Sequence, residues 1–340
     1  MNLFDKYLSI WIIIAMVVGV LLGIIPGYFN FLNAITIKHF NILLSLFLIG
    51  MIYPSLVTVQ YTFNGLSKKL FILSFIQNWI IGPFLMFFLA LGILHNSPEY
   101  LTGIILVGLA RCIAMVLVWI VMANGDMQNA IAIVGFNSIF QLIFYSFYAQ
   151  FMINILLPLF NINIANALQV PFILVFESVM IYLGIPFMLA LCTKLILYKY
   201  PSNKALKIIA LITPISLLFV IVLLFSTQAQ NIVHLPIDIL LIMTPLLCYF
   251  IIMYTISYTM GYISKLPHDQ CVVLGFTAAS NNFELAIAIC VGIFGQYSPV
   301  VLAATVGPLI EVPVMMLLVV FTNKISKGAT EDDMPLHDNH

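Results

Sequence analysis

The sequence predicts an all-α integral membrane protein whose ten transmembrane helices form a five-plus-five inverted repeat. Three observations lead to this fold class: the composition, the number of apolar segments and the placement of the lysines. Hydrophobic residues make up 63% of the 340-residue chain and charged residues 7%, whereas a soluble domain contains about 25% charged residues. The formal net charge is zero, so no attraction to nucleic acid is implied.

Ten apolar segments follow one another along the chain, and each is long enough to cross a bilayer as a helix of about 20 residues. Turn-forming sequences such as Pro26-Gly27 separate them. The segments cover about 8–25, 40–60, 70–94, 101–123, 128–157, 171–197, 206–226, 236–260, 270–294 and 300–322.

We expect a single transmembrane domain over residues 1–322, with repeat halves at about 1–160 and 161–322. Five spans in each half is an odd number, so the two halves cross the membrane in opposite directions, as in inverted-repeat transporters. Residues 323–340 are polar, and we expect them to form a short, disordered cytoplasmic tail.

The lysines predict the orientation of the chain. If the N-terminus is cytoplasmic, the outside loops contain only Lys38 and all other lysines lie inside. Cytoplasmic loops of membrane proteins carry the excess of lysine and arginine. We therefore expect a multi-pass protein of the cell membrane with both termini in the cytoplasm. The inside lysines are Lys6, Lys68, Lys69, Lys194, Lys199, Lys204, Lys207, Lys265, Lys324 and Lys327.

Two proline spacings support the internal repeat. Pro98 lies thirteen residues before Arg111, and Pro267 lies thirteen residues before Ser280. An ungapped overlay on these prolines aligns the fourth apolar segment with the ninth. Identity in the overlay is low, so it supports the repeat only together with the count of segments.

Arg111 and Cys112 mark a candidate substrate site in the fourth segment. Arg111 is the only arginine of the chain and lies near the middle of its apolar segment. A charge at the bilayer centre costs roughly 2.5 to 3.5 kcal/mol, so such a residue faces the protein interior or a cavity and has a partner. Cys112 is a soft ligand beside it. The alternatives are a structural ion pair for Arg111 and ordinary apolar packing for Cys112.

The ninth segment contains Ser280-Asn281-Asn282, which is poor helix-forming sequence in the middle of a span. Broken helices occur at membrane depth only where they line protein or a cavity. Interrupted helices that cross near the midplane are a recurrent form of transporter binding site. The side chains of Ser280, Asn281 and Asn282 are therefore candidates for binding a polar solute.

Two carboxylates are candidates for proton coupling. Burial favours the neutral form of Glu284, whereas a nearby Arg111 would favour its charged form, so their movement could load and unload a proton. Glu311 is a second buried carboxylate, and it could instead be the ionic partner of Arg111. In the fifth segment, Asn137 and Gln141 could bind substrate or provide hydrogen bonds between helices.

Several of these stretches resemble the arsenite-efflux permeases of the bile acid/arsenite/riboflavin transporter superfamily. The similarity extends from about Asp5 to Phe321, nearly the whole chain. It implies a scaffold of helices 1, 2, 6 and 7 and a core of helices 3–5 and 8–10, in which helices 4 and 9 are discontinuous and cross. The signature stretches are GLARCIAMVLVW (108–119), GFNSIFQLIFYSFYA (135–149), FTAASNNFELAIAI (276–289) and GPLIEVPV (307–314).

The resemblance also implies a function and a site. It predicts a secondary active transporter that exports arsenite, and also antimonite, by proton antiport, with no cofactor. The family's essential cysteine corresponds to Cys112, which would bind As(III), and its helix-9 glutamate corresponds to Glu284. With Glu311 as a second proton-coupling candidate, the expected substrate-binding residues are Cys112, Arg111, Asn137, Gln141, Ser280, Asn281 and Asn282.

Two other function classes remain as alternatives. A sodium-coupled symporter of organic anions would use Arg111 to bind a carboxylate and would not need Cys112. A passive channel would conduct without a counter-ion. An enzyme is not expected, because the sequence contains no HExxH or GxSxG motif.

Overall fold

The structure is a computed structural model that describes residues 8–25, 36–37, 40–58, 67–162, 168–229 and 236–332. Lys6 and Lys38 lie outside the described residues. The described residues are almost entirely helical, apart from the antiparallel pair of two-residue strands β1 (Thr36–Ile37) and β2 (Phe40–Asn41).

The helices follow the apolar segments closely. Ten such segments were predicted, and most of the observed helices occupy one of them. The helical elements are α2 (Leu8–Ile24), α4 (Ile42–Thr58), α5 (Lys68–Ile76), η1 (Gln77–Ile81), α6 (Gly82–Leu94), α7 (Pro98–Leu109), α8 (Met115–Met122), α9 (Met127–Ala149), η2 (Gln150–Leu156), α10 (Leu157–Leu159), α11 (Phe172–Val179), η4 (Met180–Gly184), α12 (Ile185–Lys199), α13 (Asn203–Thr227), α15 (Pro236–Ile263), α16 (His268–Ala279), α17 (Phe283–Phe294) and α18 (Pro299–Asp332).

Length and surface both indicate a membrane protein. Among the described residues, six helical stretches are long and apolar enough to cross a membrane, and four shorter apolar helices accompany them. Large apolar side chains lie on the outside of these helices, for example Leu195 (71% exposed), Leu317 (69%) and Leu240 (63%). Soluble monomers rarely expose so much apolar surface. This surface is therefore suited to contact with lipid.

Three long helices contain a π-helical turn immediately before a proline. The turns η1, η2 and η4 precede Pro83, Pro158 and Pro186, each at the first or second position of the following α-helix. Proline has no backbone N–H, and its ring collides with the carbonyl one turn earlier. A wider π turn at this point accommodates both effects, so these helices continue through their prolines.

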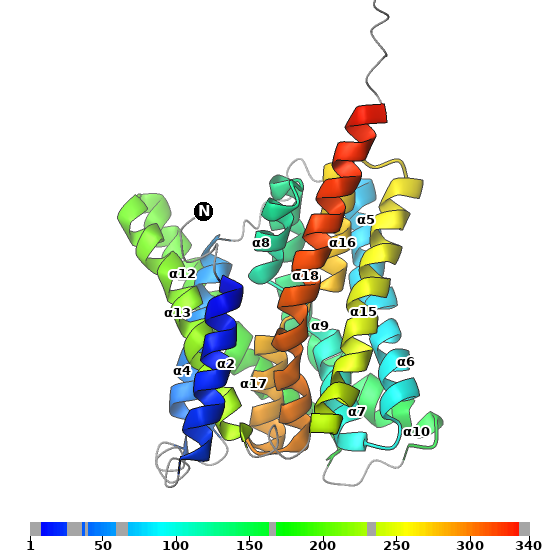
Figure 1. Ribbon diagram of the computed structural model, residues 1–340. Coiled ribbons are helices and arrows are strands. Elements are labelled where there is room, and N and C mark those ends of the chain that lie inside the picture. The colour runs from blue at the N-terminus through cyan, green and yellow to red at the C-terminus, as the bar shows by residue number, and fades with distance from the viewer. Residues whose placement is uncertain are drawn as a thin grey trace, which may run out of the picture.

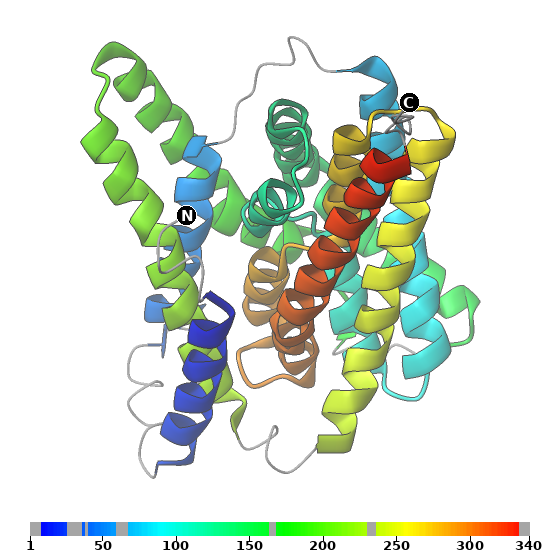
Figure 2. The same cartoon turned by 45° about the horizontal axis from the view of Figure 1, so that its top comes forward.

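The helices form two groups, which are visible in both ribbon views (Figure 1, Figure 2). In one group, α13 packs against α2 and α4, and α12 packs against α4. In the other, α15 packs against α6, α16 and α18, while α7 packs against α6 and α18. We call the first group (α2, α4, α12 and α13) the scaffold and the second group the core. Gly23 permits close contact within the scaffold, since a Cβ there would lie 2.2 Å from the Ser226 carbonyl oxygen.

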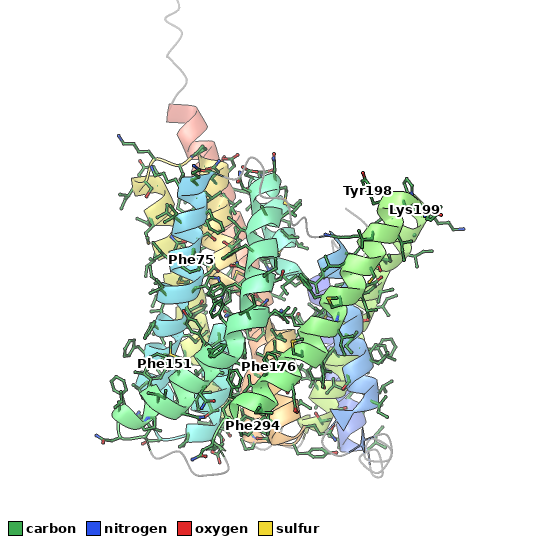
Figure 3. The ribbon with its side chains drawn as sticks, turned by 180° about the vertical axis from the view of Figure 1, so that it is seen from behind. Phe75, Phe151, Phe176, Tyr198, Lys199 and Phe294 are labelled. Carbon is green, nitrogen blue, oxygen red and sulfur yellow. The ribbon has the colours of Figure 1, made fainter. Side chains whose placement is uncertain are left out.

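One end of the molecule is rich in lysine. Helices α5, α13 and α16 begin at the upper end of Figure 1, and α12, α15 and α18 end there. Tyr198 and Lys199 are labelled at this end of α12 in Figure 3. The other described lysines lie close to the same helix ends. We call this the lysine-rich end.

The last helix extends beyond the segment expected to span the membrane. The predicted span ends at residue 322, whereas α18 continues to Asp332 and includes Pro308 and Pro313. Asn323 joins this extension to the rest of the core, because its side-chain amide donates to the Met122 carbonyl oxygen at 3.0 Å. Residues 333–340, the remainder of the expected tail, lie outside the described residues.

Candidate functional site

Two helices of the core are interrupted at mid-height. The first break separates α7 from α8, and the second separates α16 from α17. At the breaks, Ala110 (φ −87°, ψ 116°) and Ser280 (φ −82°, ψ 134°) are extended. Asn282 then restarts the second helix, since its side chain accepts a hydrogen bond from Leu285 N at 2.9 Å. Serine and asparagine favour such local bonds over helix, which explains the predicted break in the ninth segment.

The two breaks hydrogen-bond to each other. Arg111 and Asn281 form an isolated antiparallel bridge. Asn282 N donates to the Ala110 carbonyl oxygen at 2.9 Å, and Cys112 N donates to the Ser280 carbonyl oxygen at 3.4 Å. Backbone groups freed by a break in a membrane must find partners inside the protein, and here each break supplies them for the other. We call residues 110–112 and 280–282 the crossing.

The Arg111 side chain is fully buried and joins the two helices that end at the crossing. Nη1 donates to the Tyr249 hydroxyl at 2.8 Å and to the Ala278 carbonyl oxygen at 3.2 Å, and Nη2 donates to the Gly108 carbonyl oxygen. Gly108 and Ala278 lie in the last turns of α7 and α16, where the helix dipole is negative. The guanidinium thus stabilises two helix C-termini, and its partners are carbonyls and a hydroxyl.

Helix α9 fixes the backbone of the crossing from the side. Gln141 Oε1 accepts from Arg111 N at 3.1 Å, and Gln141 Nε2 donates to the Arg111 carbonyl oxygen at 3.3 Å. One turn along, Tyr145 donates to the Leu106 carbonyl oxygen at 2.7 Å. Asn137 accepts from Trp79 Nε1 at 2.9 Å. The polar residues of the fifth segment therefore contact protein groups around the crossing.

A cysteine, a serine and a glutamate meet on one side of the crossing. The Ser280 hydroxyl donates to Glu311 Oε1 at 2.5 Å, and the backbone N–H of Asn281 lies near the same carboxyl group. The Cys112 thiol lies close to the Ser280 hydroxyl, the Val116 backbone N–H and the Glu311 carboxyl group. We call Cys112, Ser280 and Glu311 the Cys112 cluster. It places a soft ligand next to a hydroxyl that is hydrogen-bonded to a carboxyl group.

Glu284 and Asn281 complete the polar groups near the cluster. Glu284 is partly exposed and lies in the first turn of α17, close enough to interact electrostatically with Cys112. Asn281 Nδ2 donates to the carbonyl oxygens of Val107 (3.0 Å) and Ala110 (3.2 Å). Its Oδ1 is buried and has no partner among the described residues. A ligand that donates a hydrogen bond could satisfy this unpaired acceptor.

Sequence reasoning missed two residues that hold Arg111 in place. Tyr249 accepts from the guanidinium, and its own hydroxyl donates to the Ala278 carbonyl oxygen at 3.0 Å. Gly82 leaves space for the guanidinium, since a Cβ there would lie 3.0 Å from Arg111 Nη1 and from the Tyr249 hydroxyl. Both residues lie in ordinary apolar stretches far from Arg111 in the chain, so no local signal distinguishes them.

The start of α17 depends on a glycine in the neighbouring helix. A Cβ at Gly307 of α18 would lie 1.7 Å from the Phe283 ring, the first residue of α17. We expect Gly307→Ala to displace Phe283 and the adjacent Asn282 and Glu284. Overpacking of this kind costs about 1–3 kcal/mol, so the protein should melt at lower temperature in detergent.

Gly92 of α6 provides the matched control for this substitution, because nothing lies within 4 Å of its added Cβ. Gly92→Ala should leave the melting temperature unchanged or raise it, since alanine favours helix by about 1 kcal/mol over glycine. Equal melting temperatures for the two variants would contradict the role given to the contact between Gly307 and Phe283.

Comparison with known proteins gives consistent matches. Residues 45–235 match the Sodium Bile acid symporter family. The chain is 39% identical over 324 residues to the arsenical-resistance protein Acr3 of Corynebacterium glutamicum, covering 93% of this chain and 87% of that protein. It is 30% identical over 340 residues to the arsenical-resistance protein Acr3 of Alkaliphilus metalliredigens, covering 94% and 92%. An uncharacterised transporter of Synechocystis is also 30% identical, over 352 residues, with coverage of 95% and 89%.

These matches span more than half of the chain for the family and nearly all of it for the relatives. The family consists of transporters and not of enzymes, and the apolar helices of this chain suit the same role. The protein is thus a multi-pass membrane transporter. The resemblance found in the signature stretches is confirmed: the chain belongs to the Sodium Bile acid symporter family and, among its members, to the arsenical-resistance permeases.

Proposed function

We propose that this transporter exports arsenite, and also antimonite, from the cytoplasm across the cell membrane. The observation that carries the proposal is the Cys112 thiol at the crossing, beside a hydroxyl and two carboxyl groups. Arsenite at neutral pH is largely the uncharged trihydroxide, which needs hydrogen-bond partners and, for its arsenic, a soft ligand such as sulfur. Two relatives named as arsenical-resistance proteins support this substrate.

Within this proposal, the polar residues fall into two sets. Cys112 binds the arsenic, while Ser280 and the unpaired Oδ1 of Asn281 bind its hydroxyl groups. The side chains in the second set bind protein groups and hold the crossing in shape, and this group includes four of the expected substrate-binding residues. These four are Arg111, Asn137, Gln141 and Asn282.

Glu284 is the proposed site of proton exchange. It is partly exposed beside the thiol, and the N-terminus of α17 favours its charged form, whereas desolvation favours its neutral form. A change in solvent access would therefore change its proton occupancy. If bound arsenite and the proton exclude each other at this position, efflux of one is tied to entry of the other, which is antiport.

The fold supports a moving core. We propose that the elements form ten spans in an inverted repeat, with α7–α8 and α16–α17 as the fourth and ninth spans. The core, which contains the crossing, would move past the scaffold and expose Cys112 to each side in turn. We propose that the lysine-rich end faces the cytoplasm, because cytoplasmic loops of membrane proteins carry the excess of lysine and arginine.

The sodium-symporter alternative remains a distinct outcome, because the matching family is named for sodium and bile acid. It requires Arg111 to bind a substrate carboxylate. In the structure, the guanidinium is fully buried and donates to Tyr249, Ala278 and Gly108. A carboxylate would have to displace these bonds, which favours the arsenite proposal.

Everted vesicles test the function directly, because export from the cytoplasm becomes uptake of arsenite. We expect an acidic interior to drive uptake by the wild-type protein, and we expect Glu284→Gln to lose the dependence on the pH gradient. Arsenic is measured in filtered vesicles by mass spectrometry. Uptake that ignores every ion gradient would indicate a channel, and sodium-driven uptake of an organic anion in place of arsenite would indicate the symporter.

A further inference from the structure

We propose that a groove at the lysine-rich end binds the phosphate headgroup of an anionic phospholipid, with Lys265 and Lys69 as its cationic ligands. The groove has a volume of about 670 Å³ and lies at the turn between α15 and α16, at the upper end of Figure 1. Such a site requires neither a particular transported solute nor a particular coupling ion. The residues that line the groove are Tyr262, Ile263, Lys265, Leu266 and Pro267.

The groove begins where the lipid-facing surface of α15 ends. The stretch of this helix that is long and apolar enough to cross a membrane covers Ile237–Ile263, and Tyr262 and Ile263 in its last turn are each 73% exposed. Tyrosine is enriched at the level of the lipid headgroups, where one end of its side chain is apolar and the other is hydrated. Residues 264–267 therefore lie at headgroup level, next to a surface that suits acyl chains.

Lys265 adopts a backbone conformation that is unfavourable for a residue with a side chain. Its φ is 55°, and among the described residues the other positive φ values belong to glycine and asparagine. Lys265 N donates to the Tyr262 carbonyl oxygen and Leu266 N donates to the Gly261 carbonyl oxygen, which is the Schellman ending of a helix, and glycine is usual at the position of Lys265. Strained residues of this kind cluster at ligand sites, so a ligand of the ammonium group explains why a lysine is present.

A second cation reaches the same turn from the neighbouring helix α5. Lys69 Nζ donates to the Ser264 carbonyl oxygen, which places its ammonium group beside Lys265 in the chain. An ammonium has three donors, and this bond uses one of them. Lys68 and Lys69 also lie in the first turn of α5, at the positive end of the helix dipole, where lysine is unfavourable and an anion is stabilised. A phosphate at this point would compensate both lysines and the helix end.

The acceptor groups around the turn are bonded within the protein. The carbonyl oxygens of Met260, Gly261 and Tyr262 at the end of α15 accept from the backbone N–H groups of residues 264–266. Asp269, the carboxylate nearest to Lys265 in the sequence, accepts from Gln270 N at 2.9 Å in the first turn of α16. The negative end of α15 is thus satisfied internally, and the lysines give the groove its positive charge.

A phospholipid matches this combination of surfaces better than a soluble anion does. The groove combines positive charge with the exposed apolar side chains of Tyr262 and Ile263 and the partly buried Leu266. A phospholipid presents a phosphate next to acyl chains, whereas a free phosphate would leave the apolar surface without a partner. Basic pockets between helices on the cytoplasmic side of membrane proteins bind anionic headgroups, and the lysine-rich end is the end that we propose to face the cytoplasm.

Thermal unfolding of the full chain, purified in detergent and stripped of lipid, tests the site. Added phosphatidylglycerol should raise the melting temperature of the wild type, whereas phosphatidylcholine, which has no net charge, should not. A lysine near an anionic headgroup contributes about five-fold to binding. Lys265→Met and Lys69→Met should therefore each raise the lipid concentration that gives half of the temperature shift by about five-fold, and the double variant should raise it by about 25-fold.

Lys265→Gly separates lipid binding from a structural role of Lys265. Glycine adopts a positive φ without strain, so without lipid this variant should melt at the wild-type temperature or above it. Its response to phosphatidylglycerol should nevertheless be weakened about five-fold, as in Lys265→Met. Lys265→Arg keeps the charge and should respond like the wild type. Lys207→Met, the matched control, removes an exposed lysine of the scaffold helix α13 and should also respond like the wild type.

Four results would overturn the site. The wild type could show no temperature shift with phosphatidylglycerol, or the same shift with phosphatidylcholine, which would exclude recognition of an anionic headgroup. Equal responses of Lys265→Gly, Lys207→Met and the wild type would place the lipid elsewhere on the surface. Inorganic phosphate that shifted the melting temperature as phosphatidylglycerol does would assign the groove to a soluble anion. None of these results bears on arsenite export, which the vesicle measurements decide separately.

Discussion

Vesicles that contain the Cys112→Ser protein are expected to take up no more arsenite than vesicles without the transporter. Serine has nearly the size of cysteine, and the backbone bond from residue 112 N to the Ser280 carbonyl oxygen does not depend on the side chain, so the crossing should remain intact. Oxygen is a hard ligand, however, whereas soft metals and metalloids select sulfur. Without the sulfur, the site offers arsenite only hydrogen-bond partners, which water provides as well. Uptake is measured as arsenic per milligram of protein at equal expression.

Cys290→Ala is the matched control for this result. Cys290 is also fully buried in the core, on α17, and it is a free thiol. Its replacement should leave arsenite uptake near that of the wild type, because it takes no part in the Cys112 cluster. If Cys112→Ser kept most of the wild-type uptake, sulfur would not be the ligand and the proposed site would be wrong.

Arg111→Met is expected to lower the melting temperature strongly as well as to abolish uptake. Methionine approximates the length of the arginine side chain but has no donor, so the carbonyl oxygens of Gly108 and Ala278 and the Tyr249 hydroxyl lose their bonds to the guanidinium. A buried polar group without a partner costs about 1–3 kcal/mol. The measurement is thermal unfolding of the purified protein in detergent.

Arg111→Lys should give an intermediate melting temperature, because an ammonium keeps the charge but cannot reproduce the planar fork of the guanidinium. Lys207→Met, which removes an exposed charge from α13, serves as the control and should melt like the wild type. A normal melting temperature in Arg111→Met with loss of uptake alone would show that Arg111 acts on the substrate and does not hold the helices together.

The break in the ninth span could be predicted from the sequence, whereas the break in the fourth could not be predicted from its residues alone. Ser280, Asn281 and Asn282 disfavour helix locally, and Asn282 caps the helix that follows. The stretch around Arg111 contains no comparable helix breaker. It is extended because it pairs with Asn281, and that contact exists only after both halves have folded.

For Arg111, the sequence predicted the need for a partner but not which groups provide it. Its position in an apolar segment predicted burial and a partner, and both are present. The identity of the partner could not be predicted, because the sequence offered the carboxylate of Glu311 while the folded chain supplies carbonyl oxygens and Tyr249. Helix ends become acceptors only where helices stop, and the sequence does not define that point precisely enough.

The antiparallel bridge at the crossing also fixes the register between two segments that lie far apart in the chain. Successive side chains of an extended segment point to opposite faces, so Ser280 meets Cys112 and Glu311 while Asn281 turns to the carbonyl of Val107. A slip of one residue would exchange these faces. An insertion or deletion within either extended segment would therefore separate the thiol from its hydroxyl while leaving every helix intact, so chemistry at this site depends on alignment as much as on composition.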